Sequence, residues 1–308
     1  MQSWIGKAAL PALAATLLAG GIASPAWGQE SDEVALLTGT LKKVKATKTI
    51  TIGYRDASVP FSYLNAARQP IGYSIDLCLE IAEDVRADLG DDTIQVQYVP
   101  VNTQNRIPRV IDGTVDLECG QTTNNTERQK EVAFSPIIFV SGTKLLVKRA
   151  SKLKSYRDFK GRSVAVTAAS TNEAAIKALN TKEGLNITVV PFPDNAQAFE
   201  AVDTGKTDAW AGDDAVLFAT VAEAKNPREF SVLDDFLSYD PYGIMYRKND
   251  PEFDTLVNAT FTRLAETREL ARIYEQWFLR KLPSGRTLGI AMSRQLASIF
   301  ESMGQPTE

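Results

Sequence analysis

The chain has 308 residues, of which 44% are hydrophobic and 23% are charged, and its formal net charge is −4. This composition is typical of a globular protein, and a mildly acidic chain without a basic block is not expected to bind nucleic acid. The absence of histidine excludes histidine-based catalytic triads, histidine general bases and the common zinc sites. We therefore expect neither a cofactor nor a metal. A site in this chain must use charged, hydroxyl, amide or aromatic side chains.

Residues 1–28 have the pattern of a secretory signal peptide. Lys7 precedes the apolar segment Ala8–Ile22, and Ala26-Trp27-Gly28 places small residues at the positions that a signal peptidase reads. Cleavage is expected before Gln29. A membrane anchor is the weaker alternative, because the apolar run is short and contains proline and glycine. The sequence thus predicts an exported protein, and the remaining chain of about 280 residues is long enough for two domains.

The first half of the chain alternates between predicted strands and helices. The periodicity predicts a strand at Thr49–Tyr54, a helix at Tyr73–Leu89 that Ser74 caps and Gly90 ends, a strand at Ile94–Val101 and a short helix at Arg106–Ile111. At these spacings, strands and helices that alternate form parallel βαβ units.

The segment Leu117–Lys130 follows, and it is predicted to run from a strand through a turn at Gly120 into a helix. Thr123 would begin the first turn of that helix, and Arg128 would lie one turn further on. Free backbone N–H groups at a helix start favour anions, and the arginine adds a positive charge. Two interpretations stay open at this point, an anion site and an ordinary capped helix.

The same alternation begins again in the second half. We predict strands at Thr143–Val147, Ser163–Thr167, Ile187–Phe192 and Asp208–Gly212, and helices that start at a Ser170–Glu173 capping box and at Asn195. The segments Gly113–Gly120 and Gly205–Gly212 share the spacing G-x-x-D-x-x-x-G. This repeat predicts two similar lobes that present the carboxyl ends of their strands, where open α/β sheets bind ligands.

The last part of the chain is predicted to be mainly helical. Phe236–Arg247 has the pattern of a strand, Pro251–Leu282 has apolar helical faces that we expect in the core, and Arg294–Met303 is a possible short helix. The two cysteines, Cys78 and Cys119, are equally consistent with one disulfide in an exported chain and with two buried thiols.

Several motifs resemble those of the periplasmic solute-binding proteins that serve ABC importers for polar amino acids, in particular the members that bind glutamate and aspartate. The motifs are Tyr54–Tyr63, Gln104–Pro108, Glu118–Gly120 and Thr122–Gln129, and the resemblance extends over roughly residues 40–285. It implies the type II periplasmic-binding-protein fold, an α/β fold with two lobes. Each lobe would hold a mostly parallel sheet flanked by helices, and two crossing hinge strands would join the lobes.

The resemblance also implies where the lobes begin and end. The crossings would fall near Val140–Lys144 and Tyr239–Gly243. Lobe 1 would then consist of residues 29–142 and 241–308, and lobe 2 of residues 143–240.

The roles of the ligand-binding residues are likewise implied by the resemblance. The α-carboxylate of an amino acid would be bound by Arg128, Thr123, Ser170 and Thr171, its ammonium group by Asp213, and a side-chain carboxylate by Arg55, Arg106 and Thr103. Phe61 or Tyr63 would pack on the aliphatic part. Gln121 and Asn195 stand where the resemblance leads us to expect serine and histidine, and both would reshape the side-chain pocket.

Charge counting supports an acidic ligand. Three arginines, Arg55, Arg106 and Arg128, would face Asp213 alone, and burying unpaired guanidinium groups is costly unless the ligand brings a second carboxylate. The sequence predicts a monomeric binding protein, not an enzyme, that delivers L-glutamate or L-aspartate to a membrane permease. One alternative is a broader specificity that includes glutamine and asparagine. A less favoured alternative is a dehydratase on the same fold, with Glu118 and Asp214 as available acids.

Overall fold

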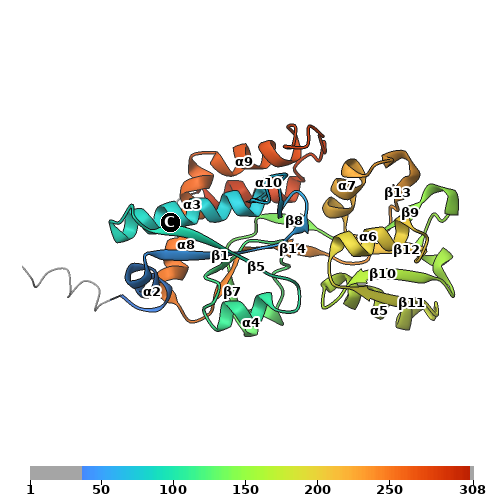
Figure 1. Ribbon diagram of the computed structural model, residues 1–308, viewed down its shortest axis with the longest axis horizontal. Helices are drawn as coiled ribbons and strands as arrows, with labels where there is room; N and C mark the ends of the chain where they lie inside the picture. The colour runs from blue at the N-terminus through green and yellow to red at the C-terminus, as the bar shows by residue number, and fades with distance from the viewer. Residues whose placement is uncertain (1–36, 306–308) are drawn as a thin grey trace, which may run out of the picture. The chain divides into compact units, whose positions relative to one another are not determined.

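The computed structural model describes residues 37–305 (Figure 1). The predicted signal peptide and its cleavage point lie outside the described residues. The part of the chain that is described contains two five-stranded sheets, each with its own helices. It thus has the predicted two-lobed α/β architecture, and we call the lobes lobe 1 and lobe 2 in the order in which the chain enters them.

The sheet of lobe 1 has the strand order β5-β1-β6-β15-β7. Its strands are β1 (Thr49–Tyr54), β5 (Gln95–Pro100), β6 (Leu117–Glu118), β7 (Val132–Phe134) and β15 (Met245–Arg247). Strand β1 pairs in parallel with β5 and β6, whereas β15 is antiparallel to β6 and β7. The helices of this lobe are α2 (Gly39–Thr47), α3 (Tyr73–Leu89), α4 (Arg106–Ile111), α8 (Pro251–Glu266), α9 (Glu269–Phe278) and α10 (Arg294–Met303).

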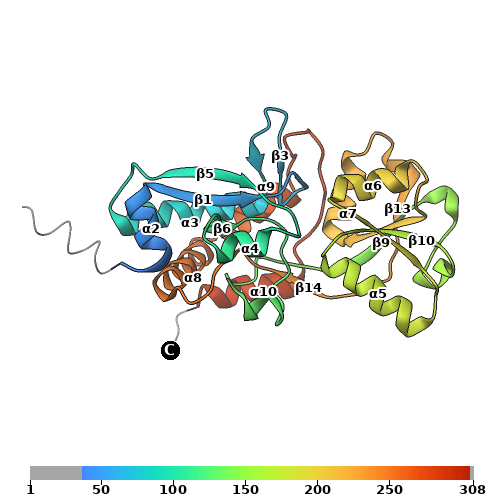
Figure 2. The same ribbon diagram turned by 60° about the horizontal axis from the view of Figure 1, so that its bottom comes forward.

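The sheet of lobe 2 repeats this plan with the order β11-β10-β12-β9-β13. Its strands are β9 (Thr143–Lys148), β10 (Ser163–Thr167), β11 (Thr188–Phe192), β12 (Ala209–Asp213) and β13 (Phe230–Val232), and its helices are α5 (Thr171–Glu183), α6 (Asn195–Asp203) and α7 (Asp214–Glu223). Strand β10 is parallel to β11 and β12, and β9 is antiparallel to β12 and β13. Figure 2 shows α6 and α7 beside β9 and β10, with α5 at the opposite side. In both sheets, therefore, four strands run in one direction and one strand, β15 in lobe 1 and β9 in lobe 2, runs antiparallel to them.

A two-stranded sheet lies where the chain passes between the lobes. Strand β8 (Phe139–Ser141) precedes the first strand of lobe 2, and β14 (Asp240–Tyr242) follows its last strand. The two strands pair antiparallel, with Val140 opposite Pro241. A small three-stranded sheet, β2 (Ala57–Ser58), β3 (Ser62–Leu64) and β4 (Pro70–Ile71), follows β1. Short 3-10 helices lie at Arg128–Lys130, Arg149–Ser151, Tyr156–Phe159 and Pro227–Glu229.

The aspartates of the G-x-x-D repeat have the same structural role in the two lobes. The Oδ2 atom of Asp116 accepts a hydrogen bond from the Thr51 backbone N–H at 2.8 Å, and Oδ2 of Asp208 accepts one from Ser163 N–H at 2.8 Å. Each aspartate thus joins the start of its own strand to the neighbouring parallel strand by a hydrogen bond from side chain to backbone. The internal repeat is therefore confirmed as a structural one.

Helix α3 has the predicted bounds, but the predicted cap is wrong. Gly72 is its N-cap residue, and the Ser74 hydroxyl instead donates to the Gly120 carbonyl at 2.7 Å. Gly90 ends the helix in a left-handed conformation, as expected. The serine therefore ties the helix start to the loop after β6 and does not satisfy the helix's own N–H groups.

The helix predicted from Thr123 onward is absent. Thr123 forms an isolated antiparallel bridge with Tyr242, and the Asn124 N–H donates to the Pro241 carbonyl at 2.7 Å. Only the 3-10 turn Arg128–Lys130 follows. The backbone groups of this segment are used by β14 instead of a helix, so the predicted helix-dipole anion site does not exist in this form.

The cysteines form a disulfide, Cys78–Cys119, which joins α3 to the residue after β6. This resolves the choice that the sequence left open. Both residues are fully buried. The bridge fixes the start of the loop that leads into the polar cavity described below.

Removing this disulfide is expected to lower the free energy of unfolding by about 4 kcal/mol, because it restricts the unfolded chain by closing a loop with a sequence separation of 41 residues. Urea denaturation of Cys78→Ala/Cys119→Ala against wild type measures the difference. The single variant Cys78→Ala is the control for an added free thiol. Equal unfolding free energies in the double variant and wild type would show that the bridge does not stabilise the fold.

The C-terminal segment packs as part of the fold. Helix α10 has the predicted bounds and buries Leu296 and Phe300. Before it, the Ser284 hydroxyl donates to Glu223 on α7 at 2.5 Å. The side chain of Gln295 donates to the Tyr239 hydroxyl at 2.6 Å. The segment therefore contacts lobe 2 and the crossing strands as well as lobe 1.

Candidate ligand-binding site

A small polar cavity lies where the strand ends of the two lobes meet. Its lining from lobe 1 is Arg55, Thr103, Arg106, Gln121 and Thr123, and its lining from lobe 2 is Thr167, Ser170, Thr171, Asn172, Asn195 and Asp213. The lobe 1 residues follow β1, β5 and β6, and those of lobe 2 lie at or after the ends of β10, β11 and β12. The repeat thus places the site at the carboxyl ends of parallel strands, as open α/β sheets do.

Several side chains reach across the cavity from one lobe to the other. The Gln121 amide donates to Asp213 Oδ2 at 3.3 Å and accepts from Asn195 Nδ2 at 3.5 Å. The Thr103 hydroxyl donates to the Ala168 carbonyl at 2.6 Å. These contacts link the two lobes directly.

Asp213 is the buried acid of the cavity. Its Oδ1 atom accepts a hydrogen bond from Asn172 Nδ2 at 2.9 Å. Burial, and next the negative charge of Asp240, raise the pKa of Asp213 to about 6. A buried carboxylate with a raised pKa gains from a cation placed beside it, so this end of the cavity favours an ammonium group.

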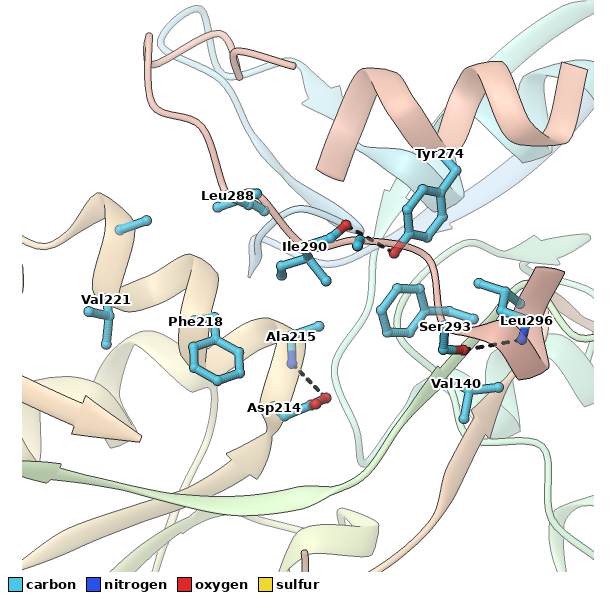
Figure 3. A pocket seen from close by; sticks show the side chains of 14 residues that line it. Val140, Asp214, Ala215, Phe218, Val221, Tyr274, Leu288, Ile290, Ser293 and Leu296 are labelled. Atoms are coloured by element: carbon cyan, nitrogen blue, oxygen red, sulfur yellow. Dashed lines mark hydrogen bonds between the residues drawn. The ribbon is translucent and has the colours of Figure 1, made fainter. Parts of the chain in front are cut away.

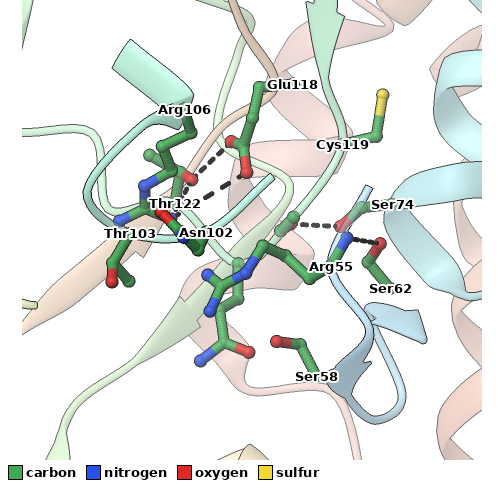
Figure 4. Close-up of polar contacts among 12 residues, drawn as sticks. Arg55, Ser58, Ser62, Ser74, Asn102, Thr103, Arg106, Glu118, Cys119 and Thr122 are labelled. Atoms are coloured by element: carbon green, nitrogen blue, oxygen red, sulfur yellow. Dashed lines mark hydrogen bonds and ion pairs between the residues drawn. The ribbon is translucent and has the colours of Figure 1, made fainter. Parts of the chain in front are cut away.

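Arg55 and Arg106 lie together at the lobe 1 side of the cavity (Figure 4). Burial, and next the charge of Arg106, lower the pKa of Arg55 to about 10, so its guanidinium group stays protonated at neutral pH. Arg106 Nη1 donates to the Thr122 hydroxyl at 2.5 Å. The guanidinium group of Arg55 has no hydrogen bond to any residue in the range 37–305. It is therefore available to an anionic ligand group.

Arg128 is placed differently from the other two arginines. It is not among the residues that line the cavity, and its Nη1 atom donates to the Thr123 carbonyl at 2.8 Å. Burial, and next Arg106, lower the pKa of Arg128 to about 10. The Thr123 hydroxyl lies 3.3 Å from that of Thr171 across the cavity and donates to Asp240 Oδ1 at 3.1 Å. Arg128 thus holds the backbone of Thr123 through one hydrogen bond.

The predicted excess of arginines over acids is wrong. Two further buried carboxylates accompany the three arginines, Glu118 beside Arg106 and Asp240 beside Thr123. Glu118 lies in a strand and Asp240 in a distant hinge strand, so only the folded chain brings these carboxylates beside the arginines. An excess of positive charge therefore does not indicate an acidic ligand. The Arg55 guanidinium group indicates one instead, because it has no hydrogen bond to another residue in the range 37–305.

The aromatic residues proposed for ligand packing lie elsewhere. Phe61 is fully buried and makes edge contacts with Tyr73, Phe139, Tyr242 and Phe278. Tyr63 makes an edge contact with Trp277. Neither Phe61 nor Tyr63 lines the cavity. Apolar burial decides their positions, so Phe61 is corrected from a ligand contact to a core residue.

Two lining residues were missed by the sequence reasoning. The Thr167 hydroxyl donates to Asn195 Oδ1 at 2.8 Å, and Asn172 donates to Asp213. A usable signal was present, because Thr167 is the last residue of a predicted strand and Asn172 lies in the first turn of the next helix. The other predicted residues, except Arg128 and Phe61, are brought together in one lining.

A second pocket, mainly apolar, lies on α7, β8 and the segment before α10 (Figure 3). Phe218, Val221, Leu288 and Ile290 contribute to its wall. Its lining contains no arginine or lysine, whereas Arg55 and Arg106 line the polar cavity. A small anion is therefore expected to bind in the polar cavity and not in this pocket. In residues 37–305, no group of side chains is arranged to hold a metal ion. No described helix has both the length and the apolar character needed to cross a bilayer.

Two similar α/β lobes, joined by crossing strands and enclosing a polar cavity at their strand ends, define the class of two-lobed solute-binding proteins. The chain belongs to the bacterial extracellular solute-binding proteins, family 3, whose profile matches residues 50–280.

Known proteins of similar sequence and structure support this assignment. The chain is 42% identical over 268 residues to the L-glutamate/L-aspartate-binding protein of Pseudomonas aeruginosa, covering 86% of this chain and 89% of the relative. It is 34% identical to a glutamate/aspartate import solute-binding protein of Escherichia coli, covering 94% and 95%. A solved ancestral amino acid-binding protein, a precursor of cyclohexadienyl dehydratase, matches with a TM-score of 0.66 and 31% identity over 78% of this chain and 99% of that one.

Proposed function

We propose that this protein binds L-glutamate and L-aspartate in the cavity between its lobes and delivers them to the permease of an ABC importer. The observation that carries the proposal is the arrangement of Arg55 and Asp213. A guanidinium group that has no hydrogen-bond partner within residues 37–305 and a buried carboxylate with a raised pKa line the same small polar cavity. A ligand with an ammonium group and a side-chain carboxylate satisfies both.

The remaining polar groups complete the proposed binding mode. Thr123, Ser170 and Thr171 line the cavity and would bind the α-carboxylate, with Arg128 holding the Thr123 backbone. Arg106 and Thr103 would assist Arg55 with the side-chain carboxylate. Gln121 and Asn195 would exchange their mutual contact for contacts to the ligand.

Delivery to a permease is proposed from the relatives, which include a glutamate/aspartate import protein. We further propose that residues 1–28 direct export to the periplasm. Residues 29–142 with 241–308 and residues 143–240 would act as the two lobes that close on the ligand. The crossing strands β8 and β14 offer two short connections for such a hinge motion.

A specific observation favours a broader specificity as the second candidate. The amide side chains of Gln121 and Asn195 both line the cavity, and an amide can donate to a carboxylate or pair with another amide. Glutamine or asparagine would then bind beside the acidic amino acids. The dehydratase alternative has less support, because Glu118 does not line the cavity and Asp214 accepts hydrogen bonds from Ser141 and its own helix.

Calorimetric titration of the chain from residue 29 onward tests these candidates. We expect tight one-to-one binding of L-glutamate and L-aspartate, and binding at least tenfold weaker for L-glutamine and L-asparagine. Equal affinities for the acids and their amides would select the broader specificity. Absence of binding to both acids would contradict the proposed function, and turnover of prephenate or arogenate would identify an enzyme.

A further inference from the structure

The carboxylate of Glu118 is a buried charge that lies outside the cavity but beside its arginines. Glu118 is the last residue of β6, opposite Gly53 of β1, and its side chain is fully buried. It is not part of the cavity lining. An ionised carboxylate in such a place is costly unless neighbouring groups compensate its charge.

A chain of polar contacts connects Glu118 to Arg106 (Figure 4). Arg106 Nη1 donates to the Thr122 hydroxyl at 2.5 Å, and that hydroxyl donates to Glu118 Oε2 at 2.5 Å. Arg106 Nη1 lies 3.9 Å from Glu118 Oε1. Thr122 therefore holds the two charges close to each other without a direct hydrogen bond between them.

The contacts leave hydrogen-bonding capacity unused on both charged groups. In residues 37–305, Arg106 Nε and Glu118 Oε1 are buried without a hydrogen-bond partner. A direct ion pair would satisfy more of these atoms. The structure thus favours the Thr122-mediated arrangement over the better-bonded one, and Arg106 stays in the cavity lining.

The backbone beside Glu118 provides the space that this arrangement needs. A Cβ atom at Gly120 would lie 2.4 Å from Glu118 Oε1 and 3.0 Å from Cγ of Arg55. Any other residue at position 120 would displace the carboxylate or Arg55. The lack of a side chain at Gly120 therefore allows the carboxylate to pack beside the arginine pair.

We propose that Glu118 positions Arg106 through Thr122 and cancels one of the two positive charges of the Arg55–Arg106 pair. The pair then offers a net charge of about one to the ligand, which matches one side-chain carboxylate. This inference rests on the proposed function, because it concerns how that site distinguishes acids from amides. Glu118 is a positioning residue and does not touch the ligand.

The test is the ratio of the dissociation constants for L-glutamine and L-glutamate, measured by calorimetry. Glu118→Gln keeps an acceptor for Thr122 and removes the negative charge, so the cavity becomes more positive and the ratio is expected to rise about tenfold. A residue that only stabilises the fold would change both affinities together and leave the ratio unchanged.

Thr122→Val should shift the ratio in the opposite direction. Without the hydroxyl, Arg106 loses its acceptor and is expected to move onto Glu118, which withdraws its charge from the ligand. The ratio should then fall at least fivefold, and Thr122→Ser should restore it. Glu127→Gln is the matched control, because Glu127 is exposed and pairs with Lys130 outside the site.

The outcomes separate this inference from the proposed function. If wild type binds neither amino acid, both fail. If wild type binds L-glutamate but the ratio changes less than twofold in folded Glu118→Gln and Thr122→Val, only the role of Glu118 is overturned. If Glu118→Gln does not fold, Thr122→Val and its serine rescue decide.

Discussion

Replacing Arg55 with alanine is expected to weaken the binding of L-glutamate about 100-fold and that of L-glutamine less than fivefold. The reason is that Arg55 lines the cavity and its guanidinium group has no hydrogen bond to another described residue. Losing one partner of a buried charged pair typically costs about 2–5 kcal/mol, and 100-fold corresponds to about 2.7 kcal/mol. Calorimetry with both ligands measures the two changes.

Arg109→Ala is the matched control for this prediction. Arg109 lies on α4 with Arg106, but it donates to the Pro100 carbonyl and does not line the cavity. Its replacement should leave both affinities within about twofold of wild type. Equal losses of glutamate and glutamine binding in Arg55→Ala would mean that Arg55 does not bind the side-chain carboxylate.

Replacing Asp213 with asparagine is expected to abolish amino acid binding and to stabilise the ligand-free protein at neutral pH. Burial and Asp240 raise the pKa of Asp213 to about 6, against 3.8 for the unperturbed group. Because the folded state binds this proton more tightly, Asp213 favours folding below pH 3.8, and this contribution is lost as the pH rises through 6. At pH 8 the ionised group destabilises the folded, ligand-free protein by about 3 kcal/mol.

Denaturant unfolding at pH 8 and pH 4 tests the sign of the contribution that Asp213 makes to the free energy of unfolding. Asp213→Asn should raise the unfolding free energy of the ligand-free protein at pH 8 and leave it unchanged, or slightly lower it, at pH 4. Asp208→Asn is the contrasting control, because hydrogen bonds from Ser163 and Arg162 lower the pKa of Asp208, so its replacement should destabilise the protein at pH 8. A loss of stability in Asp213→Asn at pH 8 would contradict the argument.

The same pKa implies a pH dependence of binding in wild type. An ammonium group binds the ionised form of Asp213, so ligand binding must release the proton that the empty site holds below pH 6. The dissociation constant for L-glutamate is therefore expected to rise about tenfold per pH unit below 6 and to be flat above 7. A constant affinity between pH 5 and 7 would show that Asp213 does not bind the ammonium group.

The local sequence was sufficient for most elements of regular structure. Strand β10 at Ser163–Thr167 and helix α3 at Tyr73–Leu89 have the predicted bounds, because each carries its own hydrophobic period and end signals. The G-x-x-D repeat identified two equivalent lobes, since each aspartate bonds to the next parallel strand within its own lobe. Of the eleven ligand residues that the motif resemblance implied, nine line one cavity in the structure.

What the sequence by itself determined is therefore the fold, the lobes and the face on which the site forms. Only the tertiary structure decided that no helix begins at Thr123, because the backbone there pairs with Tyr242 of β14, more than 100 residues later. It also decided the position of Phe61, the pairing of Cys78 with Cys119 and the charge balance of the site. The physical reason is the same in each case. These features depend on partners that are distant in sequence, so no local period or spacing predicts them. The arginines of the site come to lie beside Glu118 and Asp240 only in the folded chain.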